Sequence, residues 1–304
     1  MSLKIVSVGE VLWDMLPDGR HLGGAPANFA YHTHSLGAQT SLVSRVGKDL
    51  AGDDILSQFR AWQLPGNFVQ VDAVAETGRV TVTLDQAGVP QFTIHEPAAW
   101  DFIELTSDAF AAASQANVIC FGSLAQRRIK SRQAIQQLVA ATSPEALRIF
   151  DINLRQQFYS REVIVKSFEM ANVIKLNDTE LTTLTPMFDL NLRLETAVEE
   201  LARRFDLRAV AVTCGSLGSF LFQHGRWSHL KSKPIEVADT VGAGDAFNAA
   251  LAVGLASGMD LGKVHLLANE AASFVCTQHG ATPAMPDELI RKFSSSASLP
   301  EALI

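Results

Sequence analysis

The sequence predicts an α/β protein with a mostly parallel sheet that helices cover on both faces. Short apolar runs, which are typical of buried parallel strands, alternate with segments of helical periodicity along most of the chain. The 304 residues, 47% of them apolar, suit one large domain or two small ones with an ample core. Because no linker or repeat divides the chain, we expect a single domain over residues 1–304.

The expected elements follow one another in simple alternation. The first strand covers residues 4–11, and a glycine turn at 23–24 opens a helix. Further strands are expected at 40–46, 117–123, 147–153, 172–177, 209–215 and 218–223. Helices are expected near 131–142, 161–171 and 246–255, and a short strand is expected to end at 235–237. This order favours parallel strands joined by crossover helices.

Between residues 68 and 96 the periodicity changes from helical to alternating. Polar and apolar residues alternate over 77–84 and again over 89–94, and residues 85–88 between them have the composition of a turn. The pattern predicts a β-hairpin that is exposed on one face.

Charge and composition argue against several function classes. A net charge of −7 does not favour a basic surface for nucleic acids or anionic membranes, although a nucleotide needs only a local cradle. No apolar run reaches the roughly 18 residues that span a bilayer, and the chain enters a strand at once, without a signal peptide. The three scattered cysteines have no metal-site spacing. We therefore expect a cytoplasmic protein with reduced, buried thiols.

The most informative stretch is residues 239–247, Asp-Thr-Val-Gly-Ala-Gly-Asp-Ala-Phe. Small residues at 242–244 allow a tight turn and a close approach to a ligand. The first N–H groups of the following helix lack internal partners, so they favour an anion. Asp245 then stands where a carboxylate could act as a base beside that anion. The alternative is an ordinary helix cap without chemistry.

The nine-residue string resembles the second signature of the ribokinase-like carbohydrate kinases, the PfkB family, and the resemblance covers roughly residues 5–286. It implies a three-layer α/β/α sandwich with a small β lid built from segments at about 12–22 and 68–97. It also implies that Asp245 is the catalytic base and that Gly242, Ala243 and Gly244 form the anion hole. The turn is neither a dinucleotide-binding fingerprint nor a P-loop, because neither spacing is present.

On the sugar side, the resemblance implies three binding residues, Asp14 at the end of the first strand and Gly24 and Asn28 in the glycine turn and helix. A carboxylate and an amide suit a polyol, since each can hold two groups. Taken alone, Asn28 favours a capping or surface role, and its neighbours shift the interpretation to sugar binding. Phe92 and Trp100 are candidates for an apolar wall of the sugar pocket, with core or dimer contact as the alternative.

On the phosphate side, Arg155 matches a family arginine that reaches the substrate or the transferring phosphate, and its guanidinium suits that charge. The alternative is a surface ion pair between Asp151 and Arg155. Asn177 and Glu180 match the family's Asn-x-x-Glu motif, which holds Mg²⁺ largely through water. The same spacing is a helix capping box, and both interpretations can hold together.

The resemblance also assigns a nucleotide side to the later part of the chain. The expected ATP-binding positions are Thr213, Gly215, Gly218, Asn269 and Gly280, together with Asn177, Glu180, Gly242 and Gly244. Asp239 matches the side chain that many family members use near a monovalent cation. Ala284 stands where some members have a hydroxyl group, which weighs against potassium activation.

The resemblance implies an ATP-dependent sugar kinase that transfers the γ-phosphoryl group of Mg·ATP to a sugar hydroxyl. Residues 9–28 look most like the bacterial fructokinases, so the expected reaction converts D-fructose to fructose 6-phosphate. Ribose, 2-keto-3-deoxygluconate and other ketoses remain open, as does a non-catalytic sugar or nucleotide sensor on the same fold. An open hairpin edge invites pairing, so a homodimer through the lid is a further expectation.

Overall fold

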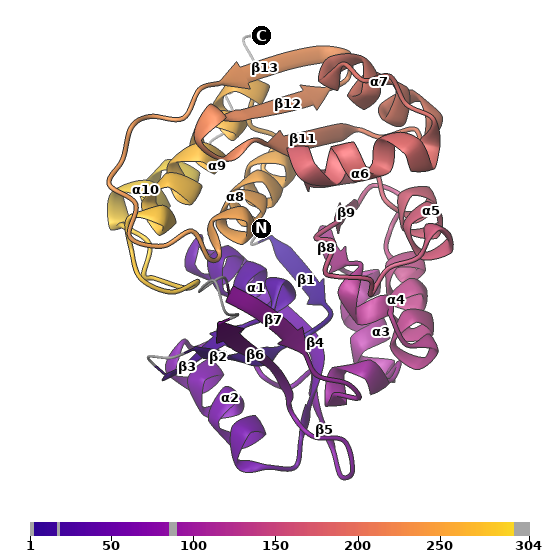
Figure 1. Ribbon diagram of the computed structural model, residues 1–304, viewed down its shortest axis with the longest axis vertical. Helices are drawn as coiled ribbons and strands as arrows, with labels where there is room; N and C mark the ends of the chain where they lie inside the picture. Colours follow the sequence, from indigo (N-terminus) through magenta and orange to yellow (C-terminus); the bar gives the residue numbers. More distant parts are fainter. Residues whose placement is uncertain (1–2, 17–18, 85–89, 295–304) are drawn as a thin grey trace, which may run out of the picture.

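The computed structural model describes residues 3–16, 19–84 and 90–294, and a nine-stranded sheet forms its centre (Figure 1). Its strands are β1 (Lys4–Val8), β4 (Gln39–Gly47), β5 (Val69–Asp72), β8 (Val118–Gly122), β9 (Leu147–Asp151), β10 (Val173–Asn177), β11 (Ala209–Thr213), β12 (Ser219–Gln223) and β13 (Arg226–Leu230). Their order is β13-β12-β11-β10-β9-β8-β1-β4-β5. The β11–β12 and β12–β13 pairs are antiparallel, and the other pairs are parallel. The predicted mostly parallel sheet is confirmed.

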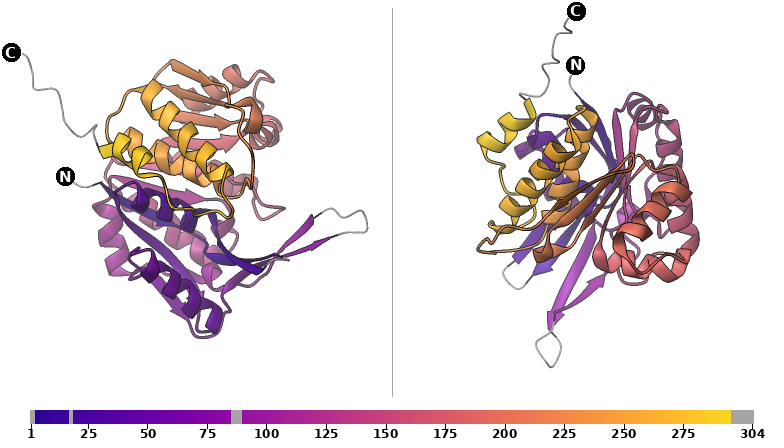
Figure 2. Two further views of the ribbon diagram at one scale, coloured as in Figure 1. Left: turned by 90° about the vertical axis from the view of Figure 1, so that its left-hand side faces the viewer. Right: turned by 90° about the horizontal axis from the view of Figure 1, so that it is seen from above.

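Helices cover both faces of this sheet, as the two views in Figure 2 show. One layer holds α1 (Ala25–Ser35), α8 (Ala243–Ala256), α9 (Leu261–Cys276) and α10 (Asp287–Ser294). The other holds α3 (Ser107–Ser114), α4 (Ile129–Ala141), α5 (Arg161–Met170), α6 (Asp178–Phe188) and α7 (Leu194–Arg204). The α2 helix (Leu50–Ala61) packs with α1 against β4, and short 3₁₀ turns lie at η1 (Ala99–Phe102), η2 (Leu124–Gln126) and η3 (Gly215–Leu217).

The apolar strands divide their side chains between two cores. Along β8, Val118 and Cys120 pack in the α8–α9 layer, whereas Ile119 and Phe121 pack in the α3–α7 layer. Successive strand residues point to opposite faces, so a strand covered on both sides reads as a continuous apolar run. This burial explains why the sequence pattern indicated parallel strands.

A second, smaller sheet stands apart from the main one. It contains β2 (Leu12–Leu16), β3 (Gly19–Gly23), β6 (Gly78–Leu84) and β7 (Pro90–Ile94) in the order β3-β2-β6-β7. Figure 2 shows β6 and β7 reaching out from the body of the protein. The predicted segment 68–97 starts too early for this small sheet, because β5 pairs with β4 in the main sheet and buries Val69. The predicted turn at 85–88 lies outside the described residues.

Two other expectations need correction. No strand forms at residues 235–237, where the backbone is irregular and both Ile235 and Val237 are exposed. An apolar alternation of three residues becomes a strand only if a neighbouring strand pairs with it. Asp14 lies on β2 of the small sheet rather than at the end of the first strand, which stops at Val8.

The described residues include no helix with the length and apolarity needed to cross a membrane. Of the three free cysteines, Cys120 and Cys214 are buried and Cys276 is half-buried.

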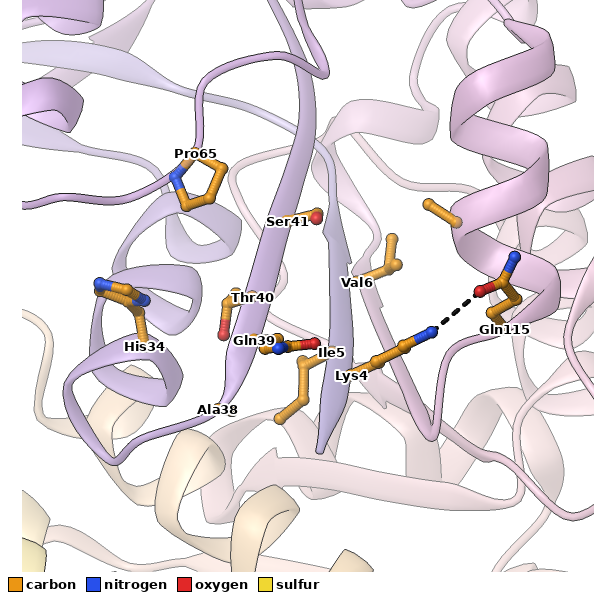
Figure 3. Close-up of a pocket in the computed structure, with 11 residues that line it drawn as sticks. Lys4, Ile5, Val6, His34, Ala38, Gln39, Thr40, Ser41, Pro65 and Gln115 are labelled. Carbon is orange, nitrogen blue, oxygen red and sulfur yellow. Dashed lines mark hydrogen bonds between the residues drawn. The ribbon is translucent and has the colours of Figure 1, made fainter. Parts of the chain in front are cut away.

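A cavity of about 480 Å³ lies at the amino ends of β1 and β4 (Figure 3). Its lining includes Lys4, whose Nζ donates a hydrogen bond of 2.9 Å to Oε1 of Gln115. Ligands of such sheets bind beyond the carboxyl ends of the parallel strands. The cavity opens at the opposite edge of the sheet.

Candidate active site

Polar residues gather beyond the carboxyl ends of the central strands. β9 ends at Asp151, β10 ends at Asn177, and Asn177 is paired in register with Thr213 at the end of β11. Glu10 follows β1 by two residues. Because these strands are parallel, their ends meet at one edge of the sheet, and this edge is the ligand-binding edge of open α/β folds.

Asp245 and Asn28 meet across this edge although 217 residues separate them in the sequence. Asn28 lies in the first turn of α1, and its Nδ2 donates a hydrogen bond of 2.8 Å to Oδ2 of Asp245 in the first turn of α8. Burial, reinforced by the charge of Asp151, raises the pKa of Asp245 to about 6. A carboxyl with this pKa can accept and release a proton near neutral pH.

The turn before Asp245 depends on glycine. Gly242 caps α8 with φ of +78°, and an added Cβ would collide with the carbonyl oxygen of Ala281. Ala281 also accepts a hydrogen bond of 2.9 Å from Nε2 of His32, a buried residue of α1 whose pKa burial lowers to about 4. The start of α8 thus packs closely against Ala281 in the loop after α9, and the His32 side chain ties that loop to α1.

A buried ion pair lies directly beneath this turn. Nζ of Lys175 is 3.1 Å from Oδ1 of Asp151, and both side chains are almost fully buried. Nδ2 of Asn248 donates to the other carboxylate oxygen of Asp151 at 3.3 Å. A Cβ placed on Gly244 would lie 3.1 Å from Nζ of Lys175, so the ammonium group lies close to the side of the turn where Gly244 has no side chain.

Three more ionisable groups share this electrostatic environment. Burial raises the pKa of Glu10 to about 7, and its Oε2 has no hydrogen-bond partner among the described residues. Burial also raises the pKa of Asp14 to about 6. The positive charge of the exposed Arg155 opposes the shifts of Asp14, Glu10 and Asp245. The charge of Arg155 therefore acts on both Asp14 and Asp245, and Asp151 pairs with Lys175 rather than with Arg155.

Asn177 and Glu180 form the capping box that the sequence allowed. Oδ1 of Asn177 accepts from the backbone N–H of Glu180, and Oε2 of Glu180 accepts from that of Asn177, both at 2.8 Å. Oε1 of Glu180 accepts from the N–H of Leu154 at 2.9 Å. Burial raises the pKa of Glu180, and the charge of Lys175 opposes this shift.

The predicted nucleotide-side residues lie at the end of β11 and just after it (Thr213, Gly215, Gly218), within α9 (Asn269) and in the loop after α9 (Gly280). Gly218 has φ of +112°, and an added Cβ would collide with the carbonyl oxygen of Leu230. Oδ1 of Asn269 accepts a hydrogen bond of 2.9 Å from Ser219, so its amide is already tied to β12. Gly215 also has a left-handed backbone.

Asp239 ties the α9 loop to the turn. Its two carboxylate oxygens accept hydrogen bonds from the backbone N–H groups of Val241 and Gly280, at 3.0 and 3.1 Å. The described residues contain no group of three or more His, Cys, Asp or Glu side chains that could hold a metal ion directly.

The two aromatic candidates differ in position. Trp100 is fully buried, and its ring lies 4.0 Å from the guanidinium carbon of Arg127, so its core alternative is correct. Phe92 on β7 is 57% exposed, which excludes it from the core. Its carbonyl oxygen accepts a hydrogen bond from Nε2 of Gln156, near Arg155 in the sequence.

The family model described as pfkB family carbohydrate kinase matches residues 17–288, which is most of the chain. The chain belongs to the PfkB family of carbohydrate kinases. Among its relatives, a sugar kinase of Pyrococcus horikoshii is 30% identical, with 94% of each chain covered. A fructokinase of Klebsiella pneumoniae is also 30% identical, over 96% of this chain and 99% of that one.

Solved structures bear out the ribokinase-like fold. The crystal structure of the Pyrococcus horikoshii sugar kinase superimposes with a TM-score of 0.81 at 28% identity, covering 97% of this chain and 99% of that one. That of a fructokinase from Xylella fastidiosa gives 0.85 at 22% identity, covering 97% and 100%. The predicted three-layer sandwich with a small β sheet is confirmed.

Sequence reasoning missed the buried polar residues that support this PfkB site. Glu10, His32, Lys175 and Asn248 were assigned no function, yet all four are buried. Lys175 approaches Gly244, His32 bonds Ala281 beside Gly242, and Asn248 bonds Asp151. One signal was available, because Lys175 is a lone charge within the apolar strand β10. A charge in a strand covered on both faces requires a buried partner.

Proposed function

We propose that this protein transfers the γ-phosphoryl group of Mg·ATP to a hydroxyl of D-fructose, giving fructose 6-phosphate. The observation that carries the proposal is the hydrogen bond from Asn28 to Asp245. It joins the glycine-opened helix α1, where the sugar is expected, to the anion-binding first turn of α8. A base, an acceptor site and an anion cradle thereby meet at one point, as phosphoryl transfer to an alcohol requires.

In this mechanism Asp14, Gly24 and Asn28 hold the sugar, and Asp245 takes the proton of the attacking hydroxyl. Gly24 suits a close backbone approach, because its φ is +103° and a Cβ there would lie 2.6 Å from the carbonyl oxygen of Glu10. The N–H groups at 242–244 stabilise the negative charge on the phosphoryl group during transfer, and the exposed Arg155 side chain balances part of that charge. Phe92 would form the apolar wall on the small sheet, which closes to exclude water.

ATP would lie along the edge formed by Thr213, Gly215, Gly218, Asn269 and Gly280, with its γ-phosphate at Gly242–Gly244. Mg²⁺, when bound, neutralises phosphate charge. Asn177 and Glu180 fit it through intervening water, because their oxygens already accept backbone hydrogen bonds and keep further lone pairs for water. The Asp239 carboxylate, which holds Val241 and Gly280, is the proposed neighbour of a monovalent cation.

The choice of fructose draws support from relatives named fructokinase, at 30% identity in Klebsiella pneumoniae and 28% in Salmonella typhimurium. Specificity among sugars depends on single hydroxyl contacts, so identities of this size leave ribose, 2-keto-3-deoxygluconate and other ketoses as alternatives. A sensor on the same fold would bind sugar or nucleotide without turnover.

The test is ADP release from Mg·ATP by the purified protein against fructose, ribose, 2-keto-3-deoxygluconate, tagatose, glucose and adenosine, with and without potassium. We expect the highest kcat/KM with fructose. Faster turnover of another sugar would keep the kinase mechanism and replace the substrate. Binding of ATP and a sugar without turnover would favour the sensor.

A further inference from the structure

Lys175 is a buried cation to which neither the sequence motifs nor the proposed mechanism gives a role. It is the one charged residue of β10, and its side chain is 8% exposed. Nζ lies 3.1 and 3.4 Å from the two carboxylate oxygens of Asp151. On its other side, Nζ approaches the backbone of Gly244, where even a methyl group would be 3.1 Å away. The ammonium group therefore lies between a strand end and the anion-binding turn.

The charges around Lys175 are mostly negative. Asp151 on β9, Glu180 on α6 and Asp245 on α8 all stabilise its charged form, and together they keep its pKa above the ordinary value despite burial. Nδ2 of Asn248 also donates a hydrogen bond to Oδ2 of Asp151, which holds this carboxylate in place. Lys175 thus stays protonated across the physiological range, as a fixed positive charge beneath the turn.

A buried ion pair is a poor device for stability alone, because the cost of desolvating both charges offsets much of their attraction. The position of the Lys175–Asp151 pair therefore says more about its role than its contribution to stability does. The pair lies beside Gly244 in the first turn of α8, and its cation, rather than its anion, approaches that residue. A preorganised positive charge in a dry site strengthens such a cradle without reorganisation.

We propose that Lys175 is a positioning residue for phosphoryl transfer, whose ammonium group supports Gly244 from below and adds fixed positive charge to the anion-binding turn. This inference deepens the proposed kinase function and rests on it. Lys175 acts through the turn and through Asp245, and it does not touch the phosphoryl group. Its charge also opposes the rise in the pKa of Asp245, which keeps the base ionised at lower pH.

The experiment compares two variants that both lack the Asp151 charge, D151N and D151N/K175M. Lys175→Met alone would leave Asp151 buried without a counter-charge and is expected to fold poorly, whereas Lys175 in D151N keeps Glu180 and Asp245 as counter-charges. The double variant replaces the pair by neutral groups of similar size, and D151N/K175Q serves as a second version if it unfolds. We expect D151N to stay within about tenfold of the wild-type kcat, and the double variant to lose about a further 10²-fold, as for loss of one anion-hole donor.

Two readouts separate this role from a structural one. The acid limb of kcat/KM should move to higher pH in the double variant than in D151N, because the charge that favours ionised Asp245 is gone. The wild-type preference for ADP with aluminium fluoride over ADP alone, measured by calorimetry, should be kept by D151N and lost by the double variant. Equal kcat and equal preference in the two variants would overturn the inference.

The calorimetric readout needs no turnover, so it remains decisive if every sugar fails as a substrate. If D151N then keeps the preference for ADP with aluminium fluoride and D151N/K175M loses it, the role of Lys175 is supported and the proposed reaction is rejected. Turnover on fructose, combined with equal kcat and equal preference in D151N and D151N/K175M, would support the proposed reaction and reject the role of Lys175.

Discussion

Burial determines the chemistry of individual carboxyl groups at the site. Asp245 has a pKa of about 6 because desolvation and Asp151 disfavour its charged form more than Asn28, Lys175 and Arg155 favour it. Its hydrogen bond from Asn28 is made to the ionised form, which also orients the carboxylate. A general base works best when its pKa lies close to the working pH.

For Asp245→Asn we therefore expect kcat to fall by about 10²-fold or more, with little change in the Kd for ATP. In the wild type, kcat/KM should fall below an apparent pKa of about 6, as Asp245 becomes protonated. Asp260→Asn is the matched control, because Asp260 caps α9 through hydrogen bonds to Gly262 and Lys263, and Asn caps equally well. Retention of more than a few per cent of turnover by Asp245→Asn would contradict the assignment.

Glu10 allows a prediction about stability rather than rate. Its pKa rises from 4.5 to about 7 on folding, so between these values the folded protein holds a proton that the unfolded chain has released. The free energy of unfolding should fall as pH rises through this window, by up to about 3 kcal/mol from this residue. Because the amide in Glu10→Gln cannot ionise, this variant should not show that fall in the free energy of unfolding.

Urea unfolding of Glu10→Gln and wild type at pH 4.5 and pH 8 measures this difference. The variant should be more stable than wild type at pH 8, and the gap should close at pH 4.5. Glu104→Gln is the control, because hydrogen bonding to Lys130 lowers the pKa of Glu104 and gives the opposite sign. A gap of the same size at both pH values would disprove the assignment of the effect to Glu10.

At the scale of elements, the start of α8 is a tightly packed backbone segment of the site. Gly242 and Gly258 lie at opposite ends of this helix with similar positive φ, 78° and 68°. Only Gly242 meets another backbone, at Ala281, whereas a Cβ at Gly258 would meet nothing within 4 Å. A comparison of the two therefore separates close packing from conformational strain.

Both Gly242→Ala and Gly258→Ala should lower the free energy of unfolding by about 1 kcal/mol through left-handed strain. In Gly242→Ala, overpacking against Ala281 should lower the free energy of unfolding by about a further 1–3 kcal/mol. It should also reduce kcat if the N–H groups at 242–244 bind the transferred phosphoryl group as proposed, since they would move. Denaturant titration and initial rates measure the two effects, and equal losses in both variants would contradict the packing argument.

The sequence predicted helices, strands and strand ends better than it predicted which distant residues contact one another. Buried parallel strands and helix starts leave local patterns, such as the apolar run of β8 or the small residues before Asp245. The partner of Asp245 is 217 residues away, and that of Lys175 is 24 residues away, so no local pattern encodes either contact. The mistaken strand at 235–237 has the same cause, because pairing depends on a distant neighbour.

At the scale of the whole molecule, the small sheet is the part that the main core does not enclose. Its edge strands are β3 and β7, and β7 projects from the body (Figure 2). Met15 and Phe92 expose 40% and 57% of their surface on this sheet. Open edges with exposed apolar side chains are sites where chains pair.

We therefore expect a homodimer in which two small sheets pair, each closing over the sugar site of its own chain. Sedimentation velocity over a range of concentrations should show a dimer whose dissociation constant rises in Phe92→Ser. Phe110→Ser is the control, because Phe110 is 46% exposed on α3, in the helix layer outside the small sheet. If the small sheet closes only within a dimer, dilution below the dissociation constant should raise KM for the sugar more than KM for ATP, whose proposed site lies on the main sheet. A monomer with unchanged kinetics at every concentration would show instead that one chain closes its site alone.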